Sequence, residues 1–207
     1  MSMMTENLER ISIYCHLSQP DRPREEIEKK LIFFPFQLSD EAYEFYQWAG
    51  APVGVTWPDD GDGSYSNSTY SCALERFFEA VNDLIHFVSI EEAERSYSPS
   101  FHDPKYLQFV SYENGSLFIA GSETQVENSP VLQLEECDPS LWFPSLTNMM
   151  LAIAESLETV GTIWPEVDDH NEDYATNKYR EKIQEQWQVV EAIARKYGSP
   201  KGAILTN

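Results

Sequence analysis

The segment Tyr106–Ser122, YLQFVSYENGSLFIAGS, holds two apolar, alternating runs on either side of the dipeptide Asn114-Gly115. Asn-Gly tolerates the positive φ angles of a tight hairpin turn, and alternating runs are typical of strands with one buried face. The segment therefore predicts a β-hairpin. We expect further strands in SPVLQLEE, residues 129–136, and in VGVTW, residues 53–57.

The segment Leu38–Gly54, LSDEAYEFYQWAGAPVG, predicts a helix over Ser39–Ala49 that stops at the following glycine. Ser39 is a suitable N-cap, and Asp40 and Glu41 suit the positive end of the helix dipole. Apolar residues recur at helical spacing, so we expect this helix to pack inside the fold rather than to serve chemistry. The stripe consists of Leu38, Ala42, Phe45 and Ala49, with Tyr43 and Tyr46 beside it.

Helices are also predicted before and after these segments. Ser89 and Glu92 have the spacing of a capping box, in which each side chain accepts a backbone N–H of the other residue. Ser145 or Thr147 is placed to cap an apolar helix whose Leu, Met and Ile residues recur as in core packing. The other predicted helices cover residues 5–17 (where 11–17 also fit a strand), about 23–33, 72–85 and 174–197, the last with Tyr179, Ile183, Trp187, Val190 and Ile193 facing inward.

Acidic residues dominate the chain, which has 35 Asp and Glu against 14 Lys and Arg and a formal net charge of −21. Two windows hold no Lys or Arg: residues 31–75 with seven acids, and residues 106–177 with 13. A field of this sign repels phosphate backbones and anionic lipid surfaces, so we expect no nucleic-acid and no membrane partner. It attracts a basic protein partner, although high charge also serves solubility alone.

The cysteines indicate a reducing compartment. Cys15, Cys72 and Cys137 are isolated, and no two of them have Cys-x-x-Cys spacing. The first residues contain no apolar run of signal-peptide length, and no later stretch approaches the roughly 18 apolar residues of a membrane span. We therefore predict a soluble, cytoplasmic protein.

Sequence motifs give no positive case for an enzyme, a cofactor or a metal site. The chain lacks Gly-x-Ser-x-Gly, the glycine-rich phosphate motifs and histidine pairs with zinc-ligand spacing. The segment DDGDGS resembles the start of a calcium loop. With Asp60 in the first position, however, Tyr65 stands where glycine is needed and Ser71 where a bidentate glutamate is needed. We therefore predict no catalytic residue, no cofactor and no bound metal.

The order of several segments resembles the SUKH superfamily, which includes fungal regulators of cell-wall glucan synthesis and many bacterial toxin-immunity proteins. The segments are EEIEKKL, FQLSDEAYEFYQWAGAP, FVSIEEAERSY, YLQFVSYENGSLFIAG and SPVLQL with PSLTNMMLAIAESLE, within about Pro23–Thr159. The resemblance implies an α+β fold, with a mixed or antiparallel sheet flanked by helices, and no catalytic residues. We expect this domain over residues 1–160, with an acidic linker and an extra C-terminal helix, 161–207, packed on it.

We predict a non-enzymatic protein-binding module, most specifically an immunity protein that neutralises a basic toxin by electrostatic complementarity. The alternatives are a stand-alone intracellular regulatory or scaffold domain of the same superfamily and an enzyme with an unrecognised site. If the two windows without basic residues converge on one face, their acids form a patch for the partner. The predicted patch consists of Asp59, Asp60, Asp62, Glu135, Glu136 and Asp138.

Overall fold

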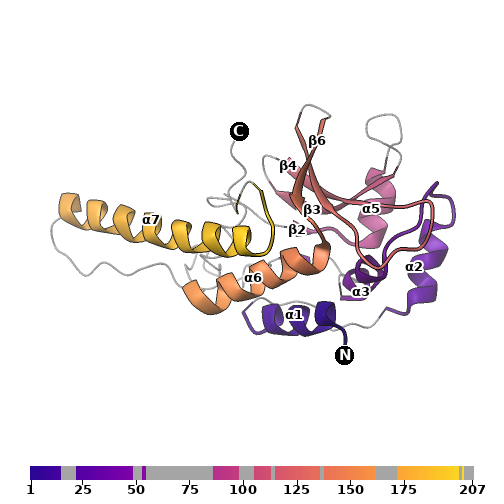
Figure 1. Cartoon of the computed structure of the whole chain (residues 1–207), viewed down its shortest axis with the longest axis horizontal. Coiled ribbons are helices and arrows are strands. Elements are labelled where there is room, and N and C mark those ends of the chain that lie inside the picture. Colours follow the sequence, from indigo (N-terminus) through magenta and orange to yellow (C-terminus); the bar gives the residue numbers. More distant parts are fainter. Residues whose placement is uncertain are drawn as a thin grey trace, which may run out of the picture.

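The computed structural model describes residues 1–14, 22–48, 53–54, 86–97, 105–112, 115–135, 138–161, 172–200 and 202. Within them the chain forms an antiparallel sheet with helices packed against it, which confirms the expected α+β class (Figure 1). The helices are α1 (Met3–Ser12), α2 (Arg24–Leu31), α3 (Asp40–Trp48), α5 (Ile90–Ser96), α6 (Leu146–Val160) and α7 (Glu172–Lys196). The strands are β1 (Val53–Gly54), β2 (His86–Phe87), β3 (Tyr106–Tyr112), β4 (Gly115–Ala120), β5 (Val131–Glu135) and β6 (Asp138–Phe143).

The sheet is a meander, because its strands lie side by side in chain order from β1 to β6 and every neighbouring pair is antiparallel. The predicted hairpin is present as β3 and β4, with Tyr112 opposite Gly115. The register shifts between Gln108 and Val110, as in a β-bulge. Phe109 and Val110 are consequently both buried, although alternation would have placed them on opposite faces.

Two strands were not predicted. β2 has only two described residues, which is too short for a periodic signal. β6 pairs with β5 and begins Asp-Pro, a dipeptide typical of turns. Proline is tolerated near the start of a strand at the end of a sheet, because its missing N–H need not join a ladder. The predicted strand at 129–136 is shorter, 131–135, and the one at 53–57 is described only at 53–54.

The helix caps follow local chemistry. Ser39 accepts the N–H of Ala42 at the start of α3, Ser89 and Glu92 form the predicted capping box of α5, and Ser145, not Thr147, caps α6. α1 differs from the prediction: it starts at Met3 because Ser2 accepts the N–H of Thr5, and it ends at Ser12. The predicted helix at 72–85 lies outside the described residues.

The aromatic face of α3 packs against the sheet, as predicted. Phe45 meets Phe87 of β2 and Phe109 of β3 edge-on, with ring centroids 5.7 and 5.6 Å apart. Tyr46 is fully buried, which raises the pKa of its phenol, and its hydroxyl donates to the carbonyl oxygen of Gln108 at 2.9 Å. The helix is therefore held by apolar burial and by one satisfied polar contact.

A hydrogen-bonded seam fastens the beginning of α3 to the connection between β4 and β5. Gln37 and Ser122 exchange backbone hydrogen bonds of 2.8 and 2.9 Å, and the N–H of Asp40 donates to the carbonyl of Val126. Phe36 lies against Gly121, where an added Cβ would come within 2.1 Å of the ring. The close approach thus requires glycine at position 121 and places α3 beside this loop.

α6 is the helix on which the other long helices meet. It packs against α1 and α7, and Figure 1 shows the N-terminal part of α7 reaching away from the sheet. Val190 and Ile193 of α7 are buried as predicted, whereas Ile183 and Trp187 are half-buried. Gly198, two residues after the end of α7 at Lys196, takes a positive φ of 93°, a conformation in which glycine commonly ends a helix.

Replacing Phe45 by Ala tests the packing role of α3. Phe45 is 2% exposed, so we expect the variant to lose about 3 to 5 kcal/mol of unfolding free energy through the cavity it leaves. Phe33→Ala is the matched control, because Phe33 is 92% exposed and should leave stability nearly unchanged. Urea unfolding followed by circular dichroism measures both. Equal stability of the Phe45 variant and the wild type would contradict the buried position.

Candidate binding site

The structure describes only part of the predicted acidic patch. Glu135 and Asp138 come together, because they are paired residues at the adjoining ends of β5 and β6, and Asp138 is exposed. Asp59, Asp60, Asp62 and Glu136 lie outside the described residues. The convergence of all six acids on one face therefore stays a prediction.

A hollow of about 450 Å³ opens where the N-terminal ends of α1, α3 and α6 meet the loop between β4 and β5. Its volume is within the range of sites that bind small molecules or single side chains. Sequence reasoning did not single it out, because its residues come from four separate segments. Four carboxylates line it: Asp40, Glu41, Glu44 and Glu127.

Glu41 is the buried carboxylate of the hollow, and it is 5% exposed. Its Oε1 accepts the backbone N–H groups of Ser129 and Leu146 at 2.6 and 2.9 Å. Its Oε2 accepts the N–H of Thr147 at 2.8 Å. The carboxylate thus lies at the positive N-terminal end of α6 and is stabilised by backbone donors and the helix dipole instead of by a cation.

The other lining carboxylates are less buried. Glu44 accepts the hydroxyls of Ser2 and Thr5, so α1 contributes neutral donors to it. Asp40 forms an ion pair with Arg24 of α2, with 3.0 Å between Oδ1 and Nη1. Glu127 is exposed at the loop. The lining therefore supplies negative charge and hydrogen-bond acceptors, a combination suited to holding a cationic group.

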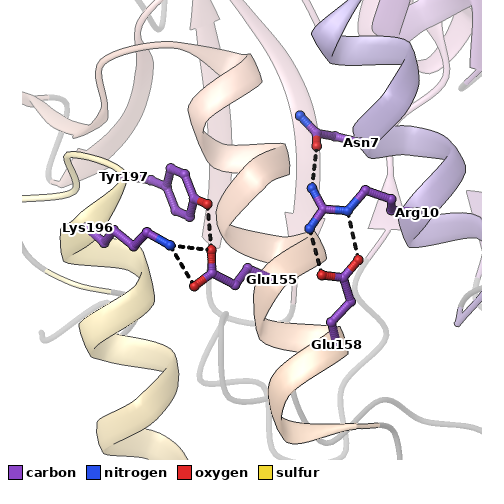
Figure 2. A network of polar contacts seen from close by, with 6 residues as sticks. All are labelled: Asn7, Arg10, Glu155, Glu158, Lys196 and Tyr197. Carbon is purple, nitrogen blue, oxygen red and sulfur yellow. Dashed lines mark hydrogen bonds and ion pairs between the residues drawn. The ribbon is translucent and has the colours of Figure 1, made fainter.

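A second polar cluster joins α1, α6 and α7 (Figure 2). Arg10 of α1 binds both oxygens of Glu158 at 2.7 Å. One turn away on α6, Glu155 accepts from Lys196 at 2.7 Å and from Tyr197 at 2.5 Å. These hydrogen bonds lower the pKa values of both glutamates and raise those of Arg10, Lys196 and Tyr197. Each charged group is paired within the cluster, so the cluster stabilises the packing of α1 and α7 on α6.

Comparisons of the chain with protein-family models, with curated proteins and with solved structures found no match. The resemblance to the SUKH superfamily therefore stays a prediction. Among the helices that the structure describes, none is both long and apolar enough to span a lipid bilayer. In the same ranges, no three His, Cys, Asp or Glu side chains are grouped as ligands for a metal ion.

One sequence signal pointed to the buried carboxylate. Glu41 lies four residues before Phe45 and seven before Trp48, so helical periodicity places it on the face that carries these buried aromatics. An acid on an apolar face needs a buried partner. Sequence reasoning instead placed Glu41 near the positive end of the dipole of its own helix, and the donors proved to belong to α6 and to the loop before β5.

Replacing Glu41 by Gln tests its role. The amide N–H₂ would face the N–H of Thr147 in place of an acceptor, so we expect a loss of about 3 kcal/mol in unfolding free energy. Glu9→Gln makes the same charge change at an exposed position of α1 and should be nearly neutral. Urea denaturation of both variants gives the comparison. A Glu41 variant as stable as the control would show that the three hydrogen bonds from backbone N–H groups do not contribute to the free energy of unfolding.

The paired glutamates on α6 predict a dependence of stability on pH. Their folded-state pKa values lie below the ordinary value of 4.5, so their contribution is present above that pH and is lost as the pH falls through the lowered values. The Glu155→Gln/Glu158→Gln variant should be less stable than the wild type at neutral pH, and the difference should vanish in acid. Glu181→Gln/Glu185→Gln, at exposed positions of α7, is the matched control. A difference that persists unchanged in acid would contradict the ion pairing.

Proposed function

We propose that this chain is a non-enzymatic protein-binding module for a basic protein partner, and most specifically an immunity protein that neutralises a basic toxin. The observation that carries the proposal is the net charge of −21 on a chain with an ordered core. A charge of this size repels itself within the compact state and so has a cost in stability. The same negative field attracts a partner that carries positive charge.

The described ion pairs strengthen this argument. Basic side chains pair with carboxylates of the same chain, so their positive charge is neutralised locally. The surplus acids consequently determine the sign of the field outside the protein. The paired basic residues are Arg10, Arg22, Arg24, Lys30, Lys105, Arg195 and Lys196.

Such a field acts mainly on the rate of association. Complementary fields steer a basic partner to the surface and disfavour acidic competitors, and salt screens the effect over about 8 Å at physiological ionic strength. An inhibitor of a toxin benefits from fast capture. The regulatory alternative predicts the same surface, so the identity of the captured protein distinguishes it from the immunity function.

A sixfold variant tests the binding surface. It replaces the three Asp residues of the 59–62 segment and Asp138 by Asn, and Glu135 and Glu136 by Gln. We expect an unchanged or slightly higher melting temperature, because repulsion is relieved, together with slower, less salt-dependent association with the partner. Capture from the native cell followed by mass spectrometry identifies the partner, and stopped-flow mixing measures the rate.

The control neutralises six other exposed acids, so that net charge is matched. These are Glu6, Glu9, Glu25, Glu26, Glu181 and Glu185. Loss of rate in the patch variant but not in the control supports the surface. Equal recovery and equal rates with both variants would place the partner elsewhere, and failure of the wild type to capture any basic protein would overturn the proposed function.

A further inference from the structure

Two large apolar side chains lie exposed directly after α2. Ile32 is 71% exposed and Phe33 is 92% exposed, and Pro35 is exposed two residues further on. Single exposed apolar side chains are ordinary, because folded proteins do not have enough polar surface to cover themselves. In the part of the chain that the structure describes, however, no other large apolar side chain is as exposed as Phe33. An adjacent pair of this kind marks a contact surface.

An aromatic cluster supports this pair from the side of the core. Phe34 packs against Phe36 and Tyr97, with ring centroids 5.5 and 4.3 Å apart. The backbone N–H of Phe34 donates to the carbonyl oxygen of Leu31 at 2.9 Å, so the turn after α2 is hydrogen-bonded. Apolar side chains on an ordered base have little conformational entropy to lose on binding.

Two basic side chains without carboxylate partners lie beside the apolar pair. Seven other basic side chains in the described ranges form ion pairs within the chain, whereas Lys29 and Arg95 have no such pair there. Lys29 precedes Phe33 by four residues, so the two lie on the same side of the turn. Arg95 lies in the last turn of α5 and donates to a backbone carbonyl of its own helix.

α2 and α5 bring these groups to one end of the molecule. The two helices pack together, and Lys30 of α2 pairs with Glu94, the neighbour of Arg95, at 3.5 Å. Figure 1 shows α2 and α5 side by side at the end opposite α7. The α2–α5 surface, formed by Lys29, Ile32, Phe33 and Arg95, thus combines exposed apolar groups with unpaired positive charge on a chain of net charge −21.

This combination selects a partner with negative charge beside an apolar side chain. A membrane or a nucleic acid presents an extended array of negative charge, which the surplus acids of this chain repel. A second copy carries the same net charge of −21 and is repelled as well. A short segment brings few charges, and salt screens their repulsion beyond about 8 Å, whereas apolar contact acts at close range.

We propose that the α2–α5 surface binds a short acidic segment of a protein partner. An apolar side chain of the segment packs on Ile32 and Phe33, and neighbouring carboxylates pair with Lys29 and Arg95. The inference does not rest on the proposed function, because its partner has the opposite charge and is bound by other residues of the chain.

A peptide selection tests this chemistry without assuming a sequence. Displayed short random peptides are depleted on the Phe33→Ser variant and then selected on the wild type, so that peptides that need Phe33 remain. We expect Asp and Glu next to Leu, Phe or Trp to be enriched over the starting library. No enrichment, or enrichment of sequences without an excess of acids, would overturn the proposal. Phe33 is 92% exposed, so the variant should keep its fold, which urea unfolding verifies.

The apolar contact is tested with the most enriched peptide, synthesised with a fluorescent label and titrated by anisotropy. Phe33→Ser should weaken its binding at least about tenfold, as for the central side chain of an interface. Ile13→Ser removes a side chain that is 78% exposed just after α1 and should bind as the wild type does. Equal affinities of the two variants would contradict the position of the contact.

The charge contact is tested with the same peptide and two variants of equal net charge. Lys29→Gln/Arg95→Gln should weaken binding roughly two- to tenfold, because exposed ion pairs each contribute little. Arg195→Gln/Lys196→Gln removes two positive charges from the last turn of α7 and should bind as the wild type does. Equal weakening by both variants would reduce the effect to net charge and overturn the site.

Two further measurements test the other possible occupants. Vesicles of phosphatidylserine and phosphatidylcholine, sedimented with the wild type, should leave the protein in the supernatant. Analytical ultracentrifugation should give the same molecular mass for the wild type and Phe33→Ser. Binding to the vesicles, or a wild-type dimer that Phe33→Ser abolishes, would assign the surface to a membrane or to a second copy and overturn the proposal.

Discussion

The carboxylate of Glu41 is the contact on which the arrangement of this part of the fold depends. It lies on α3, yet all three of its donors are backbone groups of other segments, in the loop before β5 and at the start of α6. The first N–H groups of a helix have no partner within it, and in a buried position they need one from elsewhere. A single side chain thus determines where α6 begins relative to the aromatic helix, and with it the shape of the hollow.

Charge serves two separate purposes in this molecule. On α6, Glu155 and Glu158 hold α7 and α1 through pairs that neutralise their charge. Around the hollow, carboxylate oxygens remain without basic partners among the described residues, apart from the contact of Asp40 with Arg24. The first arrangement stabilises the helices. The second concentrates negative charge around the hollow, at the cost of some repulsion within the fold.

Much of the secondary structure was predictable because its causes are local. The hairpin of β3 and β4, the Ser39 cap and the Ser89–Glu92 capping box each depend on residues within a few positions of one another. The prediction was wrong for the limits of α1 and omitted β2 and β6. β6 forms because β5 offers it a hydrogen-bonding edge, and such pairing overrides the turn preference of its first residues.

The sequence by itself determined the acidity, the main helix caps and the packing role of the aromatic helix, because composition and short-range periodicity decide these properties, and the α+β class was expected from the order of the segments that resembles the SUKH superfamily. Only the tertiary structure decided that Glu41 is buried against α6 and that Asp40, Glu44 and Ser145 line one hollow. These residues lie on helices that are about 100 positions apart in the chain. Their proximity results from packing against a shared sheet, which no local pattern encodes.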